Sequence, residues 1–170
     1  MPDMLKKEIV IKLDAADCRL RDQIVSMKIT ETKLLKQKHT FTPTSQRHPF
    51  YEGFTGELAF AKWLHVPYKY KPYDKQDADV MGYQIKTTQR TDGCLIKQAH
   101  MPTGVYVLGI VNAALDTVTF KGWALTHEIE QEAYWRTDVP KPAYFVPQSE
   151  LWSMSELTST KELAAYHGWL

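Results

Sequence analysis

Four polar side chains in the first hundred residues are of types that together can hold a metal ion and act on a phosphate group. Glu57 and Asp79 carry carboxylates, Gln84 carries an amide oxygen, and Lys86 carries an ammonium group. Hard cations such as Mg²⁺ prefer oxygen ligands. A cation beside such a site stabilises the negative charge that develops when a phosphate is attacked. The chemistry to consider is therefore metal-assisted hydrolysis.

A predicted helix, Gly53–His65, carries the first of these residues. Residues three or four apart lie on one face of a helix, so Glu57 shares a face with apolar residues. Those apolar neighbours are Phe60, Ala61 and Leu64. An ionised carboxylate on such a stripe is costly unless it is paired or binds a cation. The alternative is that Glu57 lies at the edge of the stripe, or pairs with Lys62 or a distant base.

A predicted tight hairpin, Asp77–Thr88, carries the other three residues. Its expected parts are a strand at Ala78–Met81, a turn at Gly82 and a strand at Tyr83–Thr88. Side chains alternate along a strand, so Gln84 and Lys86 point to one face. A two- or three-residue turn brings Asp79 beside them.

Two alternatives to this interpretation of the hairpin remain. It is equally consistent with a surface hairpin that has a polar outer face. Asp77 faces the same side as Asp79 and replaces it as the acidic ligand if the turn is wider.

The combination resembles the PD-(D/E)XK nuclease superfamily, and most of all the small nucleases of phages and mobile elements. In that family an acidic residue on the first core helix, an Asp on the second core strand and a (D/E)-x-K motif on the third line one cleft. The matching segments are GELAFAKWL with Glu57, DADV with Asp79, and QIKTT with Gln84 and Lys86. A later Gly122-Trp123 turn also matches. The match covers roughly residues 53–124.

The resemblance implies a metal-dependent endodeoxyribonuclease. Glu57, Asp79, Gln84 and the backbone carbonyl of Ile85 would hold Mg²⁺ or Mn²⁺, and Lys86 would orient or help deprotonate the attacking water. Gln84 stands where the family usually has Asp or Glu, so we expect weaker Mg²⁺ binding and a preference for Mn²⁺. Nucleic acid, expected to be DNA, is the partner.

Three basic or hydroxyl-bearing residues are expected to contact that nucleic acid: Thr88, Arg90 and Lys97. A homodimer would supply the two sites that cutting both strands requires, although the sequence carries no dimer signature. One alternative function is a catalytically inactive nuclease-fold protein that acts as a DNA-binding or assembly module. The other is an unrelated α/β protein whose polar hairpin is a coincidence.

Length and composition fit a folded domain. The 170 residues are 44% hydrophobic and 24% charged, which are ordinary values for globular proteins. The net charge of +1 hides an asymmetry, because residues 1–100 hold 17 Lys and Arg against 12 Asp and Glu, whereas residues 101–170 hold 4 against 8. Phosphate binding needs local positive charge, which the first half offers.

Other classes of protein fit the sequence less well. Cys18 and Cys94 are far apart, and the histidines lack the spacing of a zinc site. The N-terminus is too charged for a signal peptide, and the longest apolar run, Gly104–Leu115, is too short to span a bilayer. We therefore expect a soluble protein in the cytoplasm of a cell or of an infected host, with no membrane partner.

The expected architecture is a single α/β domain, residues 1–170, with a central mixed β-sheet flanked by helices. The nuclease-like core is expected at about 53–124, as a restriction-endonuclease-like αβββ unit followed by further strands. A helix at 15–36, with Leu20, Ile24, Met27 and Leu34 or Leu35 turned inward, and an aromatic-rich tail at 134–170 are expected to pack on it. Additional strands are predicted at 8–13, 66–70, 105–111 and 117–124, and short helices at 126–132 and near 149–157.

Overall fold

A computed structural model describes residues 8–34, 49–70 and 79–157. The helices are α1 (Ala15–Leu34), α2 (Pro49–Leu64) and α3 (Thr126–Ile129), with 3₁₀ turns at Glu132–Tyr134 and Gln148–Glu150. The strands are β1 (Ile9–Lys12), β2 (Tyr83–Thr88), β3 (Leu95–Lys97), β4 (Val105–Val111), β5 (Thr117–Leu125), β6 (Trp135–Arg136) and β7 (Ala143–Val146). Residues 154–157 are helical. In the described ranges, none of the helices combines the length and apolar character needed to cross a membrane.

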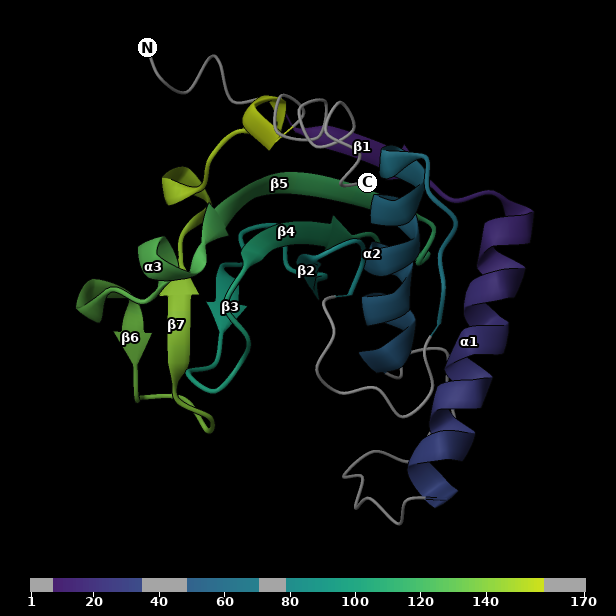
Figure 1. Cartoon of the computed structure of the whole chain (residues 1–170), viewed down its shortest axis with the longest axis horizontal. Coiled ribbons are helices and arrows are strands. Elements are labelled where there is room, and N and C mark those ends of the chain that lie inside the picture. Colours follow the sequence, from purple (N-terminus) through teal and green to yellow (C-terminus); the bar gives the residue numbers. More distant parts are fainter. Residues whose placement is uncertain (1–7, 35–48, 71–78, 158–170) are drawn as a thin grey trace.

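Two β-sheets organise the described residues (Figure 1). The larger sheet has four strands in the order β1-β5-β4-β2. In it β5 is antiparallel to both β1 and β4, whereas β2 is parallel to β4. The smaller sheet is antiparallel, in the order β3-β7-β6. The protein is therefore a mixed α/β structure, and its larger sheet is mixed as the sequence predicts.

Helices and the second sheet cover opposite faces of the larger sheet. Helix α2 packs on one face, and α1 lies outside α2, away from the smaller sheet (Figure 1). Side chains of β4 alternate between two cores because the strand is covered on both faces. Val107 and Val111 belong to the core under α2, whereas Tyr106 and Leu108 belong to the core shared with β3 and β7. Because β4 is covered on both faces, its sequence is a continuous run of apolar residues.

Most of the predicted regular elements are confirmed. The strands at 8–13, 105–111 and 117–124 correspond to β1, β4 and β5, and the second arm of the hairpin is β2. Helix α1 starts at the predicted residue, and the part of the prediction beyond Leu34 lies outside the described residues. Helix α2 begins earlier than predicted, at Pro49, because proline is well tolerated in the first turn of a helix.

The predicted strand at Val66–Tyr70 is wrong, because this segment is irregular. Helix α2 ends in a left-handed turn at His65 (φ 58°), and the Val66 N–H donates to the Ala61 carbonyl at 3.1 Å. Val66 and Tyr68 pack on the core individually, without a strand partner. Their apolar character reflects this packing. The first of the three strands expected after the helix is therefore not formed by residues 66–70.

The Gly122-Trp123 pair is also different from the prediction, because it lies inside β5 and not in a turn. The pairing of β4 with β5 shifts register between Leu108 and Gly109 at this point, as in a β-bulge. A β-carbon on Gly122 would lie 2.5 Å from the Trp152 carbonyl oxygen, so only glycine allows this close approach.

The buried face of α1 was predicted incorrectly. Ile24 is buried, but Leu20 and Met27 are 41% and 48% exposed, and Leu34 is exposed as well. Polar residues share the buried face with Ile24 and Val25: the Arg21 guanidinium donates to the Leu115 carbonyl and to Thr55 Oγ1. Hydrophobic periodicity mispredicts the buried face of a helix when some of its buried contacts are hydrogen bonds. Leu35 lies outside the described residues.

Candidate active site

A tight turn positions the first acidic residue. Met81 and Gly82 both have positive φ (46° and 88°), as a type I′ turn requires, and the N–H groups and carbonyls of Val80 and Tyr83 are bonded to each other. The turn predicted at Gly82 is therefore confirmed. Its first arm is reduced, among the described residues, to the single bridge between Val80 and Tyr83. Asp79 comes directly before this bridge.

Asp79 is fixed against the outer edge of β2. Its Oδ2 accepts a hydrogen bond from the Ile85 N–H at 2.7 Å. The N–H and C=O of one strand residue point to the same side of the strand. The Ile85 carbonyl therefore also faces this edge, on the side where Asp79 lies.

Helix α2 supplies the second carboxylate through a close approach to β2. Gly56 lies so near the strand that a β-carbon there would be 2.2 Å from Thr87 Cγ2. The next residue is Glu57, whose Oε1 accepts a hydrogen bond from the Tyr68 hydroxyl at 3.2 Å. The glycine thus lets the helix bring Glu57 to the strand, and the segment after the helix holds its carboxylate.

The two carboxylates share an enclosed environment. Burial raises the pKa of Glu57 well above its usual range, and the nearby charge of Asp79 raises it further. Burial also raises the pKa of Asp79, while its hydrogen bond from Ile85 and the charge of Lys86 act in the opposite direction. Lys86 likewise lowers the pKa of Glu57. The charges of Asp79 and Lys86 are therefore close enough to shift the pKa of Glu57.

Gln84 lies beside Lys86 on the face of β2 that points away from α2. It is 4% exposed and pairs in register with Tyr106 of β4. Its amide makes no hydrogen bond to another described residue, and none of the fully enclosed polar side-chain atoms there lacks a partner. The amide therefore keeps access to water. No hydrogen bond joins Gln84 to Glu57 or Asp79 among the described residues.

The Tyr106 ring lies beneath the side chain of Lys86. The Lys86 ammonium lies 5.8 Å from the centre of the Tyr106 ring, within the range of a cation–π contact. Burial, together with the charges of Asp79 and Glu130, raises the pKa of Tyr106 to about 12. The ring therefore stays neutral and gives Lys86 a fixed apolar and aromatic support.

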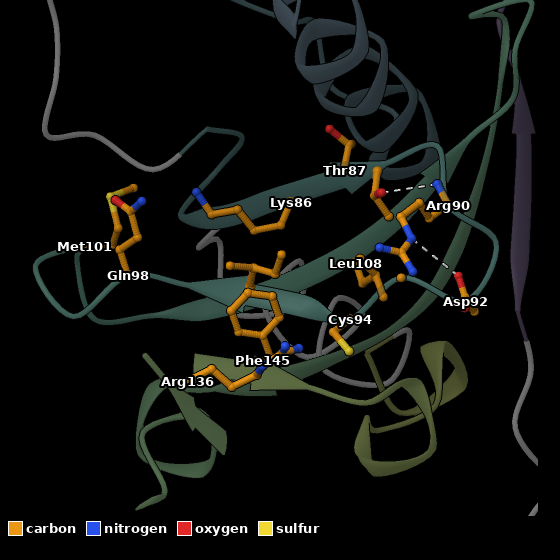
Figure 2. Close-up of a pocket in the computed structure, with 13 residues that line it drawn as sticks. Lys86, Thr87, Arg90, Asp92, Cys94, Gln98, Met101, Leu108, Arg136 and Phe145 are labelled. Atoms are coloured by element: carbon orange, nitrogen blue, oxygen red, sulfur yellow. Dashed lines mark hydrogen bonds and ion pairs between the residues drawn. The ribbon is translucent and has the colours of Figure 1, made fainter. Parts of the chain in front are cut away.

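A groove of about 430 Å³ opens beside Lys86, between the two sheets (Figure 2). We call it the inter-sheet groove. The residues that characterise it are Lys86 and Thr88 of β2, Arg90 and Asp92 of the following loop, Arg136 of β6 and Phe145 of β7. Two residues predicted to contact nucleic acid, Thr88 and Arg90, thus line a groove that also contains Lys86.

Lys97 has a different environment from the one expected for a phosphate contact. Its side chain is fully buried, its ammonium pairs with Glu130 at 2.7 Å, and it lies 5.7 Å from the centre of the Tyr106 ring. A buried lysine with an acidic partner fixes the second sheet to the core. It does not line the inter-sheet groove.

Several residues near the site were not found from the sequence. The sequence places Tyr68 in a predicted strand, and Arg136 and Phe145 lie in a tail that is expected to pack on the core. Only a pairing of β7 with β3 brings the last two to Lys86, and no local pattern signals a contact so distant in sequence. Asp77, the alternative acidic ligand, lies outside the described residues.

The donors near β2 are of the type that binds hard cations, although they include only two acidic groups. No cluster of three or more His, Cys, Asp or Glu side chains suited to a metal occurs in the part of the chain that the structure describes. Any cation site here would need the Gln84 amide and the Ile85 carbonyl in addition to Glu57 and Asp79. No protein-family model, no curated protein and no solved structure matches this chain.

Proposed function

We propose that this chain is a divalent-metal-dependent nuclease that hydrolyses phosphodiester bonds in DNA. The observation that carries the proposal is the enclosed pair of carboxylates, Glu57 and Asp79, beside the ammonium of Lys86. Clusters of buried ionisable groups with strongly shifted pKa values are typical of functional sites. The cationic groove next to Lys86 adds a surface suited to a phosphate backbone.

The donors fit a divalent cation. Two neighbouring buried carboxylates repel each other, and a bound cation removes that penalty. Glu57, Asp79, the Gln84 amide and the Ile85 carbonyl are the groups that hold Mg²⁺ or Mn²⁺ in this proposal. When bound, the ion supplies a water of lowered pKa and polarises the scissile phosphate.

The chain's own residues prepare the site for this chemistry. Tyr68 donates to Glu57 and the Ile85 N–H donates to Asp79, so both carboxylates are held in place before substrate arrives. Lys86, supported by Tyr106, provides positive charge for the phosphate oxygens and orients the attacking water. Thr88 and Arg90, farther along the same groove, bind the adjoining backbone.

The arrangement of elements supports a restriction-endonuclease-like core. A helix bearing the first acidic residue packs on a mixed sheet, and the strand bearing the lysine pairs parallel with its neighbour. The second acidic residue precedes that strand across a tight turn. This is the order of parts expected from the resemblance, with Asp79 directly before the tight turn.

Plasmid cleavage tests the proposal. Wild-type protein with Mg²⁺ or Mn²⁺ is expected to convert supercoiled plasmid to nicked or linear DNA, and EDTA should stop the reaction. Lys86→Ala should reduce the rate about 100-fold or more, because it removes charge stabilisation that acts in the transition state. Lys12→Ala, an exposed lysine of β1 on the opposite edge of the sheet, is the matched control and should cleave normally.

Two results would contradict the proposal. Cleavage that persists in EDTA and in Lys86→Ala would show that a different site or a contaminant is responsible. Absence of cleavage by a folded wild-type protein that still binds DNA would instead favour a catalytically inactive DNA-binding or assembly module, which the neutral Gln84 is compatible with.

A further inference from the structure

None of the residues proposed to hold the metal lines the inter-sheet groove, so its occupant is a separate question. The groove contains Lys86 at one end and extends past Thr88 to Arg90, with Arg136 and Phe145 on the opposite wall (Figure 2). Its volume of about 430 Å³ is in the usual range for sites that bind one small molecule. A ligand in the groove would therefore lie directly beside the active-site lysine.

Charge favours an anion in this groove. Lys86, Arg90 and Arg136 line it, against the single carboxylate of Asp92. Arg90 pairs with Asp92 at 3.6 Å, and Arg136 pairs with Asp138 at 2.8 Å, but all four side chains are largely exposed. An exposed ion pair at this distance contributes little, so Arg90 can exchange Asp92 for a phosphate, whereas Arg136 is held by two hydrogen bonds to Asp138.

The wall opposite Lys86 suits a nucleobase. Phe145 is half-buried, and the guanidinium of Arg136 lies 4.7 Å from the centre of its ring. Figure 2 shows the Phe145 ring in the middle of the groove, below the strand that carries Lys86. Unpaired bases stack on aromatic rings and on arginine planes, whereas a base in a duplex has its faces occupied.

We propose that the inter-sheet groove binds one unpaired nucleotide of the substrate strand, with its base against Phe145 and Arg136 and its phosphate near Lys86. This inference rests on the proposed nuclease function and makes single-stranded or locally unpaired nucleic acid the preferred substrate. A base within a stacked duplex would have to be extruded before it could enter a groove of this size.

The test measures binding without cleavage. Fluorescein-labelled eight-nucleotide single strands, in DNA and RNA form, and a blunt duplex of the same sequence are titrated with protein in EDTA and followed by anisotropy. Wild-type protein is expected to bind at least one of the single strands about tenfold more tightly than the duplex. Phe145→Leu and Arg136→Gln should each weaken single-strand binding about tenfold, in line with the loss of one stacked base.

Two further variants guard against indirect effects. Phe145→Tyr keeps an aromatic ring and should bind like wild type, so a loss confined to Phe145→Leu reports on stacking and not on folding. Arg19→Gln removes an exposed arginine from α1, on the side of the molecule away from the groove, and should leave binding unchanged. Melting temperatures within a few degrees of wild type confirm that the variants are folded.

The inference fails if the protein binds the duplex as tightly as it binds the DNA and RNA single strands. It also fails if Phe145→Leu and Arg136→Gln bind both of these single strands with wild-type affinity. The outcome is separable from that of the proposed function, because no cleavage is needed. A wild-type protein that cleaves plasmid but shows no groove-dependent single-strand binding overturns the inference alone. Groove-dependent binding without any cleavage overturns the proposed function and leaves a single-strand-binding groove.

Discussion

At the scale of single residues, Glu57 decides how the site behaves. Its carboxylate accepts a hydrogen bond from Tyr68, yet burial and the neighbouring Asp79 still raise its pKa well above the usual value. Folding therefore shifts this side chain towards its neutral form. Under the proposed function, a divalent ion would favour the ionised form, so metal binding and protonation of Glu57 would oppose each other.

Glu57→Gln should stabilise the protein at neutral to alkaline pH when divalent ions are absent. A carboxyl whose pKa is raised on folding contributes stability that is fully present below its unfolded pKa, near 4.5, and is lost as the pH rises through the folded pKa. The free energy of unfolding of the wild type should thus fall relative to Glu57→Gln between pH 5 and pH 8. We expect a difference of about 1–3 kcal/mol at pH 8, the usual penalty for a poorly satisfied buried polar group.

Urea unfolding at several pH values in EDTA measures this difference. Glu132→Gln, an exposed glutamate on a 3₁₀ turn, is the control and should follow the wild-type curve. If Glu57→Gln also runs parallel to wild type across this range, the carboxylate is not in the enclosed, repelled state that the site requires.

At the scale of elements, the contact between α2 and β2 assembles the site. Gly56 and Thr87 approach so closely that the helix and strand leave no room for another carbon atom. Gly53, in the same helix, has open space around it. Substitutions at these two positions therefore distinguish the effect of tight packing from the general effect of glycine on helix stability.

Gly56→Ala should destabilise the protein by about 1–3 kcal/mol, because overpacking forces α2 away from β2. Melting temperature is the measurement, and a loss of that size lowers it by about 2–4 °C for each kcal/mol in a chain of this length. Adding Thr87→Ser, which removes the clashing methyl group, should restore part of the loss. Gly53→Ala should be neutral or slightly stabilising, since alanine is the better helix former. Equal melting temperatures for Gly56→Ala and wild type would contradict this account.

The elements also show what can be predicted from sequence and what cannot. Strands β4 and β5 were predicted nearly to the residue, because β4 is buried on both faces and the two are joined by a tight connection. The smaller sheet was missed, since β3 and β6 are very short and β3 pairs with β7 across a long separation. Local patterns carry no information about such pairings.

The same distinction applies to the candidate site. Glu57, Asp79, Gln84 and Lys86 were named from their spacing and from a resemblance, and the structure brings the charges of three of them into mutual range. The Tyr68 hydroxyl and the wall of the groove depend on tertiary packing, so no pattern in the sequence pointed to them. Arg21 illustrates the same limit, because its burial follows from acceptors on other elements.

At the scale of the whole molecule, the two sheets meet at β4, with the site at one end of the groove between them. The basic half of the chain supplies Lys86 and Arg90, whereas Arg136 and Phe145 come from the half that is acidic overall. A local positive surface thus forms although the net charge is only +1. The proposed binding of a nucleic acid strand therefore depends on the charge and shape of the groove and not on the net charge of the chain.

Titration calorimetry with Mn²⁺ tests the central claim most directly. Protein stripped of metal should bind Mn²⁺ saturably at pH 7.5, Asp79→Asn should weaken binding at least about tenfold, and Gln84→Glu should tighten it by adding a third carboxylate. Lys12→Ala should bind as wild type does. A folded wild-type protein that binds no Mn²⁺, or that binds it as tightly after Asp79→Asn, would contradict the account.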